Sequence, residues 1–172
     1  MKINTSSSVV IRILLWIVML FGGAWYAIAQ DIENPYFQSI PFHMLTSILG
    51  VIITFFAFKA SANGGRELSK GRKGDIPRLE TNQLVTTGIY SCMRHPMLFG
   101  LTLLPLGWAL LLGSPTFISF VAPLEMLFII FMVLIFEEME CKKKFGDAYL
   151  EYSKRVPMVC LRRECLWRLF LK

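Results

Sequence analysis

The chain has 172 residues, of which 55% are hydrophobic and 17% charged, and its apolar residues fall into four long runs. A soluble core does not explain this composition, so the sequence predicts an integral membrane protein. The formal charge of +6 does not indicate a nucleic-acid partner, because the Lys and Arg residues stand beside the hydrophobic runs. Cations in such places set topology and meet anionic lipid headgroups.

The first apolar run covers about residues 9–29 and is long enough to cross a bilayer. It ends in Ala-Ile-Ala-Gln at residues 27–30, which is similar to a signal-peptidase site. We favour a retained helix, because about 20 apolar residues make a full bilayer span rather than a short signal core. Trp16 and Trp25 suit interface positions, and Arg12 can extend toward the near interface.

Three further runs follow, at about residues 41–60, 97–112 and 116–136, and a Gly-Ser-Pro turn separates the last two. A short turn between helices makes them antiparallel neighbours. We therefore expect an all-α fold, a polytopic transmembrane helical bundle with about four spans. It should form a single membrane-embedded domain over residues 1–172, since the remaining length leaves no room for a second globular domain.

Basic residues gather in the long second loop and in the C-terminal tail. They are Lys59, Arg66, Lys70, Arg72, Lys73, Arg78 and Arg94 in the loop and Lys142, Lys143, Lys144, Lys154 and Arg155 in the tail. The first loop and the turn at Gly113 contain neither Lys nor Arg, so both termini and the second loop are predicted to face the cytosol. The second loop opens with Ser-Ala-Asn-Gly-Gly at residues 61–65, which favours a solvated linker, with a mobile lid as the alternative.

The four cysteines show neither a CxxC pair nor the Cys/His spacing of a zinc site, so no metal centre is expected. They are Cys92, Cys141, Cys160 and Cys165. All fall on the side predicted to be cytosolic, where thiols are kept reduced. We expect free thiols, with Cys160 and Cys165 as weak candidates for lipidation.

An Arg94-His95-Pro96 triplet stands where the second loop enters the third apolar run. Proline suits the first turn of a helix, because its missing N–H is not needed there. Alone, the triplet equally fits a helix start at the membrane interface, with cations reaching for the headgroups. His43 lies at the opposite interface without charged neighbours in sequence and is expected to be structural.

Three acidic residues, Glu137, Glu138 and Glu140, emerge at the foot of the fourth run. The last two precede lysines by four residues, as in ordinary helix ion pairs worth about 0.2–0.5 kcal/mol each. Glu137 differs from these two acids, because the residue four positions after it is a cysteine and not a lysine. Because the last two helices are expected to be antiparallel neighbours, Glu137 should approach His95.

Tyr149 and Tyr152 are spaced three apart in the tail, so a helix would place both rings on one face. Arg-Val-Pro follows at residues 155–157. One interpretation is an amphipathic helix at the membrane interface with a belt of aromatic rings. The other is a C-terminal amphipathic helix that covers a site.

Together these segments resemble the isoprenylcysteine carboxyl methyltransferases and the related phospholipid methyltransferases, a family of integral membrane methyltransferases. The segments with this likeness are Leu84-Val-Thr-Thr-Gly-Ile-Tyr90, Arg94-His-Pro96, Gly100, Glu137-Glu138, Phe145-Gly146, Tyr149, Tyr152 and Arg155-Val-Pro157. Their order and spacing match over residues 82–157. The triplet alone is a weak signal, whereas the two-part pattern is fairly specific.

The resemblance implies an enzyme that binds S-adenosylmethionine in a cytosolic pocket and methylates a lipidic or small-molecule acceptor. Catalytic roles would fall to Arg94, His95 and Glu138. Cofactor contacts, several of them through the backbone, would come from Asn82, Gln83, Leu84, Val85, Tyr90, His95, Pro96, Met97, Leu98 and Glu137. The protein would mainly align donor and acceptor and exclude water, and His95 or Glu138 would take a proton from an amine acceptor.

Two positions depart from the family pattern. Leu98 stands where the family usually has Tyr, and Val133 stands where prenylcysteine enzymes have an Arg expected to meet the substrate carboxylate. The acceptor therefore stays open between an isoprenylcysteine carboxylate, a lipid amine and a small thiol. The oligomeric state is also open, because the Gly-Gly pair at residues 22–23 does not by itself establish a dimer.

Two alternatives to a methyltransferase remain. One is a membrane reductase that uses NADPH, since sterol reductases have a comparable motif near a C-terminal hairpin, although this chain lacks their longer pattern. The other is a non-catalytic membrane scaffold in which the motif survives for folding, as Leu98 and Val133 would favour.

Overall fold

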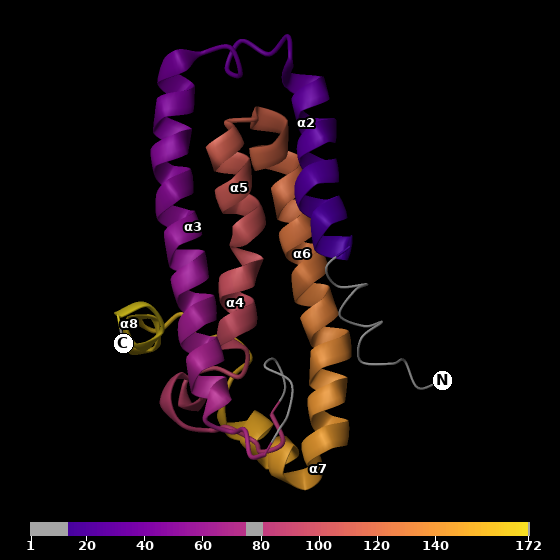
Figure 1. Ribbon diagram of the computed structural model, residues 1–172, viewed down its shortest axis with the longest axis vertical. Coiled ribbons are helices and arrows are strands. Elements are labelled where there is room, and N and C mark those ends of the chain that lie inside the picture. Colours follow the sequence, from indigo (N-terminus) through magenta and orange to yellow (C-terminus); the bar gives the residue numbers. More distant parts are fainter. Residues whose placement is uncertain (1–13, 75–80, 172) are drawn as a thin grey trace. The chain divides into compact units, whose positions relative to one another are not determined.

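The computed structural model describes residues 14–74 and 81–171, and over these residues it contains helices and no strand (Figure 1). The predicted start of the first span, with Arg12, and residues Pro77 and Arg78 lie outside the described residues. The elements in chain order are η1 (Val18–Gly22), α2 (Gly23–Asp31), α3 (Ile40–Ser69), η2 (Gly88–Ser91), α4 (Pro96–Thr102), α5 (Leu104–Leu112), η3 (Phe117–Val121), α6 (Ala122–Met132), η4 (Val133–Glu137), α7 (Glu138–Arg155) and α8 (Arg163–Leu171).

Several of these elements join into long apolar helices. In the described part of the chain, Leu14–Asp31, Ile40–Ser69 and Phe117–Arg155 are long and apolar enough to cross a membrane, and Pro96–Leu112 is a shorter apolar helix. They correspond to the four predicted runs, and the chain is an all-α polytopic membrane protein. The second and fourth helices extend well beyond their predicted ends at about residues 60 and 136.

The chain divides into two compact units, and the first combines Met1–Ile53 with Pro105–Leu127. Its buried cluster is built mainly from small residues, which let helices approach closely. The cluster consists of Ala24, Ala27, Ala109, Phe117 and Ala122. Gly113 turns the chain with a φ of 62°, so the predicted tight turn is present.

A buried carboxylate closes that turn. Asp31 accepts hydrogen bonds from the Ser114 hydroxyl (2.5 Å), the Thr116 amide (2.9 Å) and the Thr116 hydroxyl (2.6 Å). The Ser114 hydroxyl in turn accepts a bond from the Phe117 amide at 3.1 Å. These bonds satisfy amide groups at the start of the following helix, which would otherwise lack partners.

The second unit combines Thr54–Leu104 with Phe128–Lys172. Its helices approach closely at two glycines: a Cβ on Gly64 would lie 2.7 Å from the Met97 amide nitrogen, and one on Gly100 would lie 2.6 Å from the Ala57 carbonyl oxygen. Residues 61–65 therefore belong to α3, and the prediction that they begin a loop is wrong. Their small side chains allow α4 to pack against α3 rather than breaking the helix.

The last long helix bends sharply within α7. Gly146 has a φ of 55° and a ψ of −134°, a backbone conformation open essentially only to glycine. The Phe-Gly element of the sequence pattern thus marks a kink that redirects the chain. Tyr149 and Tyr152 follow this kink.

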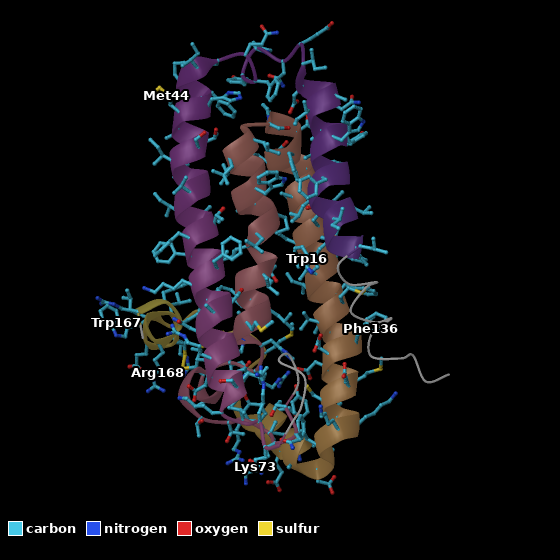
Figure 2. The ribbon with its side chains drawn as sticks, viewed as in Figure 1. Trp16, Met44, Lys73, Phe136, Trp167 and Arg168 are labelled. Atoms are coloured by element: carbon cyan, nitrogen blue, oxygen red, sulfur yellow. A yellow bond between two sulfur atoms is a disulfide. The ribbon has the colours of Figure 1, made fainter. Side chains whose placement is uncertain are left out.

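The C-terminal helix α8 rests on the end of α3 and on η2 (Figure 1). The Asn63 side-chain amide donates to the Leu169 carbonyl at 2.6 Å, and the Arg168 guanidinium donates to the Ser91 hydroxyl at 3.2 Å. Leu169 is buried, whereas Trp167 projects outward with 59% of its surface exposed (Figure 2). α8 is therefore amphipathic, and it was not predicted, because the predicted amphipathic helix is the one that carries Tyr149 and Tyr152.

Two of the cysteines are not free. A disulfide joins Cys92 to Cys165, and the free thiols among the described residues are Cys141 and Cys160. The expectation of reduced thiols is wrong for the bonded pair, which lies 73 residues apart in sequence. Such a separation leaves no local spacing pattern for a sequence reading to detect.

Candidate functional site

The Arg-His-Pro triplet lies at the start of α4 in the second unit. His95 is the residue before the helix, with a φ of −125°, and Pro96 occupies the first turn. The His95 carbonyl accepts the Phe99 amide at 2.9 Å. The triplet is thus a helix start, as predicted, and the imidazole is buried with 7% of the residue surface exposed.

Glu138 is the centre of a buried polar cluster. Its Oε1 atom lies 2.8 Å from His95 Nε2 and accepts hydrogen bonds from Arg94 Nε at 3.0 Å and from the Tyr149 hydroxyl at 2.8 Å. Only 6% of the surface of Glu138 is exposed. A buried carboxylate requires a partner of opposite charge, and the Arg94 guanidinium supplies it.

From the sequence, Glu138 was predicted to pair with Lys142 on its own helix. Glu137 was predicted to approach His95. The structure instead bonds Glu138 to His95 and Arg94, which stand more than forty residues earlier in the chain. The reason lies in η4, a π turn directly before Glu138. A π turn shifts the helix register by one residue and so changes which side chain faces inward.

Arg94 binds more than the carboxylate. Its Nη1 atom donates to the Ser153 carbonyl at 2.9 Å and to the Val156 carbonyl at 3.1 Å. The planar guanidinium presents several donors in a fixed fork, so one side chain holds Glu138 and the end of α7 together. Arg94 thereby ties the residue before His95 to the end of α7.

The backbone of the triplet also pairs with the chain after α7. The Arg94 amide donates to the Pro157 carbonyl at 3.0 Å, and the His95 amide donates to the Met158 carbonyl at 3.4 Å. The Arg-Val-Pro element of the sequence pattern therefore supplies acceptors to the triplet. Two halves of the pattern far apart in sequence form one structural unit.

Tyr149 and Tyr152 lie on one face of α7, as their spacing predicts, with ring centroids 5.9 Å apart. Both rings are buried, with 2% and 4% of the residue surface exposed. The Tyr152 hydroxyl donates to the Tyr90 carbonyl at 2.5 Å. An interfacial aromatic belt is thus excluded for this pair, and the helix covers the cluster.

Tyr90 lies under this cover and is 7% exposed. Burial raises the pKa of its phenol, and the negative charges of Glu67 and Glu137 add to the effect. The ring is therefore neutral at physiological pH. The contribution of Glu137 is the smallest of the causes that raise this pKa.

The segment predicted to contact the cofactor, residues 82–85, runs back along the end of α3. The Asn82 side chain bonds both backbone groups of Lys73, at 2.9 and 2.7 Å. The Gln83 backbone N–H donates to the Gly71 carbonyl at 3.2 Å. Val85 is buried in the same hydrophobic cluster as Tyr90. Leu84, which stands between Gln83 and Val85 in the sequence, is partly buried.

The other predicted contacts lie in the first turn of α4. Pro96 is buried, Met97 and Leu98 are partly buried, and the Met97 carbonyl accepts the Ser61 hydroxyl at 3.1 Å. The close approach of Met97 to Gly64 holds this turn against α3. The first turn of α4, with His95 before it, is thereby anchored from α3 and from α7.

The pairing with Glu138 sets the chemistry of His95. An ionised carboxylate can only accept, so Nε2 carries the proton and, in the neutral ring, Nδ1 carries a lone pair. An imidazole oriented by a carboxylate in this way can remove a proton from a bound group. Among the described residues no cluster of His, Cys, Asp or Glu could hold a metal ion.

Comparison with protein families gives a match to the model described as phospholipid methyltransferase, over residues 42–148. This range covers more than half of the chain and contains the triplet, Glu137 and Glu138. No solved structure matches the chain.

Two curated proteins are similar to the chain. Protein-S-isoprenylcysteine O-methyltransferase B of Arabidopsis thaliana is 34% identical over 117 residues, which cover 67% of this chain and 56% of that protein. Delta(14)-sterol reductase TM7SF2 of Mus musculus is 25% identical over 155 residues, which cover 81% of this chain and 37% of that protein. The chain thus spans less than two thirds of the length of either relative.

Proposed function

Because the chain belongs to the phospholipid methyltransferase family, we propose that it is an integral membrane methyltransferase that uses S-adenosylmethionine and methylates a lipidic or membrane-partitioned acceptor. One observation supports this proposal most strongly. The two halves of the sequence pattern form a single buried cluster in which Glu138 binds Arg94, His95 and Tyr149. Glu138 and Tyr149 lie on a helix of membrane-spanning length, and Arg94 and His95 precede a shorter apolar helix.

The residues around Tyr90 fit a cationic cofactor. Glu137 provides negative charge where it acts on a buried, neutral aromatic ring, and such a pair attracts a positively charged group. When bound, S-adenosylmethionine supplies an electrophilic methyl group on a sulfonium. In this proposal Glu137 and Tyr90 hold the donor, and backbone groups of residues 82–85 and 96–98 contact it together with His95.

The cluster residues have separate roles. Arg94 and Glu138 position the start of α4 against the end of α7 through the bonds described above. Tyr149 and Tyr152 close the region and exclude water. His95 takes a proton when the acceptor is an amine, whereas a carboxylate or thiolate acceptor needs no base.

We further propose that this site faces the cytosol. The basic residues flanking the site support that topology by the positive-inside rule. Lys73 is one of them and stands four residues after the end of α3 (Figure 2). On this proposal residues 1–172 act as a single methyltransferase domain, and an acceptor dissolved in the bilayer reaches the site along the membrane.

Calorimetry with S-adenosylmethionine and the purified protein in detergent tests the proposal. Glu137→Ala should weaken binding about 10- to 100-fold, because one charge-assisted interaction contributes roughly 1.5–3 kcal/mol. Glu151→Ala removes an exposed carboxylate from α7 and serves as the matched control with unchanged affinity. No binding to the wild type, or unchanged binding to Glu137→Ala, would overturn the assignment.

A second candidate function is reduction with NADPH, which the similarity to Delta(14)-sterol reductase TM7SF2 favours. A ligand that binds only the folded state raises the unfolding temperature. Thermal unfolding in the presence of each cofactor therefore separates the two functions. Protection by NADPH and not by S-adenosylmethionine would establish the reductase instead.

A further inference from the structure

Three cysteine sulfurs meet beside the candidate site. The disulfide joins Cys92, which follows η2, to Cys165 in the first turn of α8. The sulfur of a third cysteine, Cys160, lies 3.0 Å from the sulfur of Cys165. Cys160 is a free and buried thiol, so a thiol stands in contact with a disulfide.

These sulfurs belong to the same hydrophobic cluster as Tyr90. Cys160 and Cys165 are 8% and 5% exposed, and Cys92 packs against the cluster. Cys160 also stands two residues after Met158, whose carbonyl accepts the His95 amide. The three sulfurs are therefore linked by short stretches of chain to both sides of the candidate site.

We propose that Cys92, Cys160 and Cys165 form a thiol–disulfide exchange centre that decides whether α8 is covalently tied to the segment carrying Tyr90, Arg94 and His95. In the exchange, the Cys160 thiolate attacks the Cys165 sulfur. A bond forms between Cys160 and Cys165 while the bond between Cys92 and Cys165 breaks. Cys92 leaves as a thiolate and takes up the proton that Cys160 lost, so no oxidant or reductant is consumed.

The two pairings have different mechanical consequences. A bond between Cys92 and Cys165 locks α8 onto residues 88–95 across 73 residues of sequence. A bond between Cys160 and Cys165 closes only a five-residue loop within the C-terminal segment and releases residues 88–95. Removing a long-range link restores conformational freedom to the segment that it held.

The proposed cytosolic location of the site is consistent with a disulfide that opens and closes. In a cytosolic setting disulfides are mostly transient and redox-sensing rather than permanent. An internal thiol next to the bond lets the lock open without an external partner entering a buried cluster. The coupling of this lock to cofactor affinity rests on the proposed function, whereas the exchange itself does not.

Peptide mapping of the full-length protein tests the exchange. The protein is purified in detergent without reductant, its free thiols are blocked with N-ethylmaleimide at low pH, and linked peptides are identified by mass spectrometry. The wild type should yield links from Cys165 to both Cys92 and Cys160. Cys160→Ser should yield only the link to Cys92. Cys92→Ser is incubated with oxidised glutathione, the two-electron oxidant that joins its Cys160 and Cys165 thiols, and should yield only the link to Cys160.

Two results would overturn the exchange centre: a wild type with no link or with the Cys92 link alone, and a Cys92→Ser variant in which Cys160 and Cys165 are both alkylated. Cys141→Ser is the control and should leave the mapping unchanged, because Cys141 is a free thiol. The Cys160→Ser protein also shows whether removal of the third thiol disturbs folding, through its unfolding temperature.

Hydrogen–deuterium exchange tests the lock. Dithiothreitol donates two electrons and two protons to the Cys92–Cys165 bond and becomes a cyclic disulfide. Treated Cys160→Ser should take up deuterium faster over residues 88–95, while Cys165→Ser, which can form neither bond, should not respond to dithiothreitol. An equal response of both variants would overturn the lock.

Affinity for S-adenosylmethionine then separates the two proposals. Reduction of Cys160→Ser should weaken binding about fivefold or more, a typical coupling between sites. If no variant binds the cofactor while mapping and deuterium uptake behave as expected, the proposed function fails and the exchange centre stands. If binding is present and does not respond to reduction, the coupling fails.

Discussion

Each unit contains a buried carboxylate with several hydrogen bonds, and the two carboxylates differ in the chemistry of their partners. Asp31 in the first unit is bonded by hydroxyl groups and by a backbone amide around one turn. Glu138 in the second unit is bonded by an arginine, a histidine and a phenol that come from separate segments. Burial therefore does not distinguish the two acids, whereas the charge of their partners and the number of segments that supply them do.

The largest expected effect comes from replacing each acid by its amide. Glu138→Gln leaves the Arg94 guanidinium without its counter-charge in a buried cluster and should lower the free energy of unfolding by about 3–5 kcal/mol. Asp31→Asn should cost only about 1 kcal/mol, because its partners are neutral and Asn caps a helix as well as Asp. Denaturant titration in detergent measures both, with exposed Glu151→Gln as the control on α7. Equal losses at positions 31 and 138 would erase the distinction between the clusters.

A smaller effect is expected when position 94 keeps its positive charge but loses the planar guanidinium with its several donors. In Arg94→Lys the ammonium can reach Glu138 but cannot also serve the carbonyls of Ser153 and Val156. We expect a loss of about 2 kcal/mol in the free energy of unfolding, and faster proteolysis of residues 156–162. A variant as stable as the wild type would show that the charge of Arg94 matters and its geometry does not.

Overpacking offers a test of which unit supports the site. A Cβ on Gly64 would lie 2.7 Å from the Met97 amide, and one on Gly50 in the first unit would lie 2.7 Å from the Leu111 amide. Both Gly→Ala variants should lose about 1–3 kcal/mol of stability. Only Gly64→Ala should also weaken binding of S-adenosylmethionine, because it displaces the start of α4. Weaker binding in both variants would contradict this assignment.

Gly65→Ala is the control for these substitutions. A Cβ there would meet nothing nearer than the Met97 sulfur at 3.9 Å. Alanine is favoured over glycine inside a helix by about 1 kcal/mol. This variant should be slightly more stable than the wild type, with unchanged cofactor affinity.

The smallest effect is expected for Tyr149→Phe. It removes the phenol donor to Glu138 and leaves Arg94 and His95 in place. The loss should be about 1 kcal/mol, as for a single neutral hydrogen bond. The free energies of unfolding of Tyr149→Phe and Glu138→Gln are measured together. A loss in Tyr149→Phe as large as that in Glu138→Gln would mean that the hydroxyl, and not the Arg94 charge, holds the carboxylate.

The sequence allowed the helical fold to be predicted, because runs of apolar residues as long as a bilayer is thick have few other structures. It did not allow the ends of the helices to be predicted. Residues 61–65 contain two glycines, which signal a loop, but Gly64 is needed where α4 approaches α3. Close approach between helices depends on tertiary contacts, which a local signal does not contain.

The segments that form the candidate site were predicted from the sequence. The side chains that bond to one another within it were not. The triplet and the acidic foot of the last helix were both identified, and the rings of Tyr149 and Tyr152 share a face as expected. The bond between His95 and Glu138 was not predicted, because the π turn just before Glu138 changes the helix register and leaves no sign of this in a local spacing pattern. The disulfide was missed because its cysteines have no local spacing signal.

Transfer of a labelled methyl group from S-adenosylmethionine into a membrane lipid extract tests the central claim most directly. The wild-type protein in detergent should produce labelled material that partitions into organic solvent. Glu137→Ala should lose this activity, and Glu151→Ala should keep it. A correctly folded wild-type protein that binds the cofactor and labels nothing in the extract would contradict a methyltransferase with a lipidic acceptor.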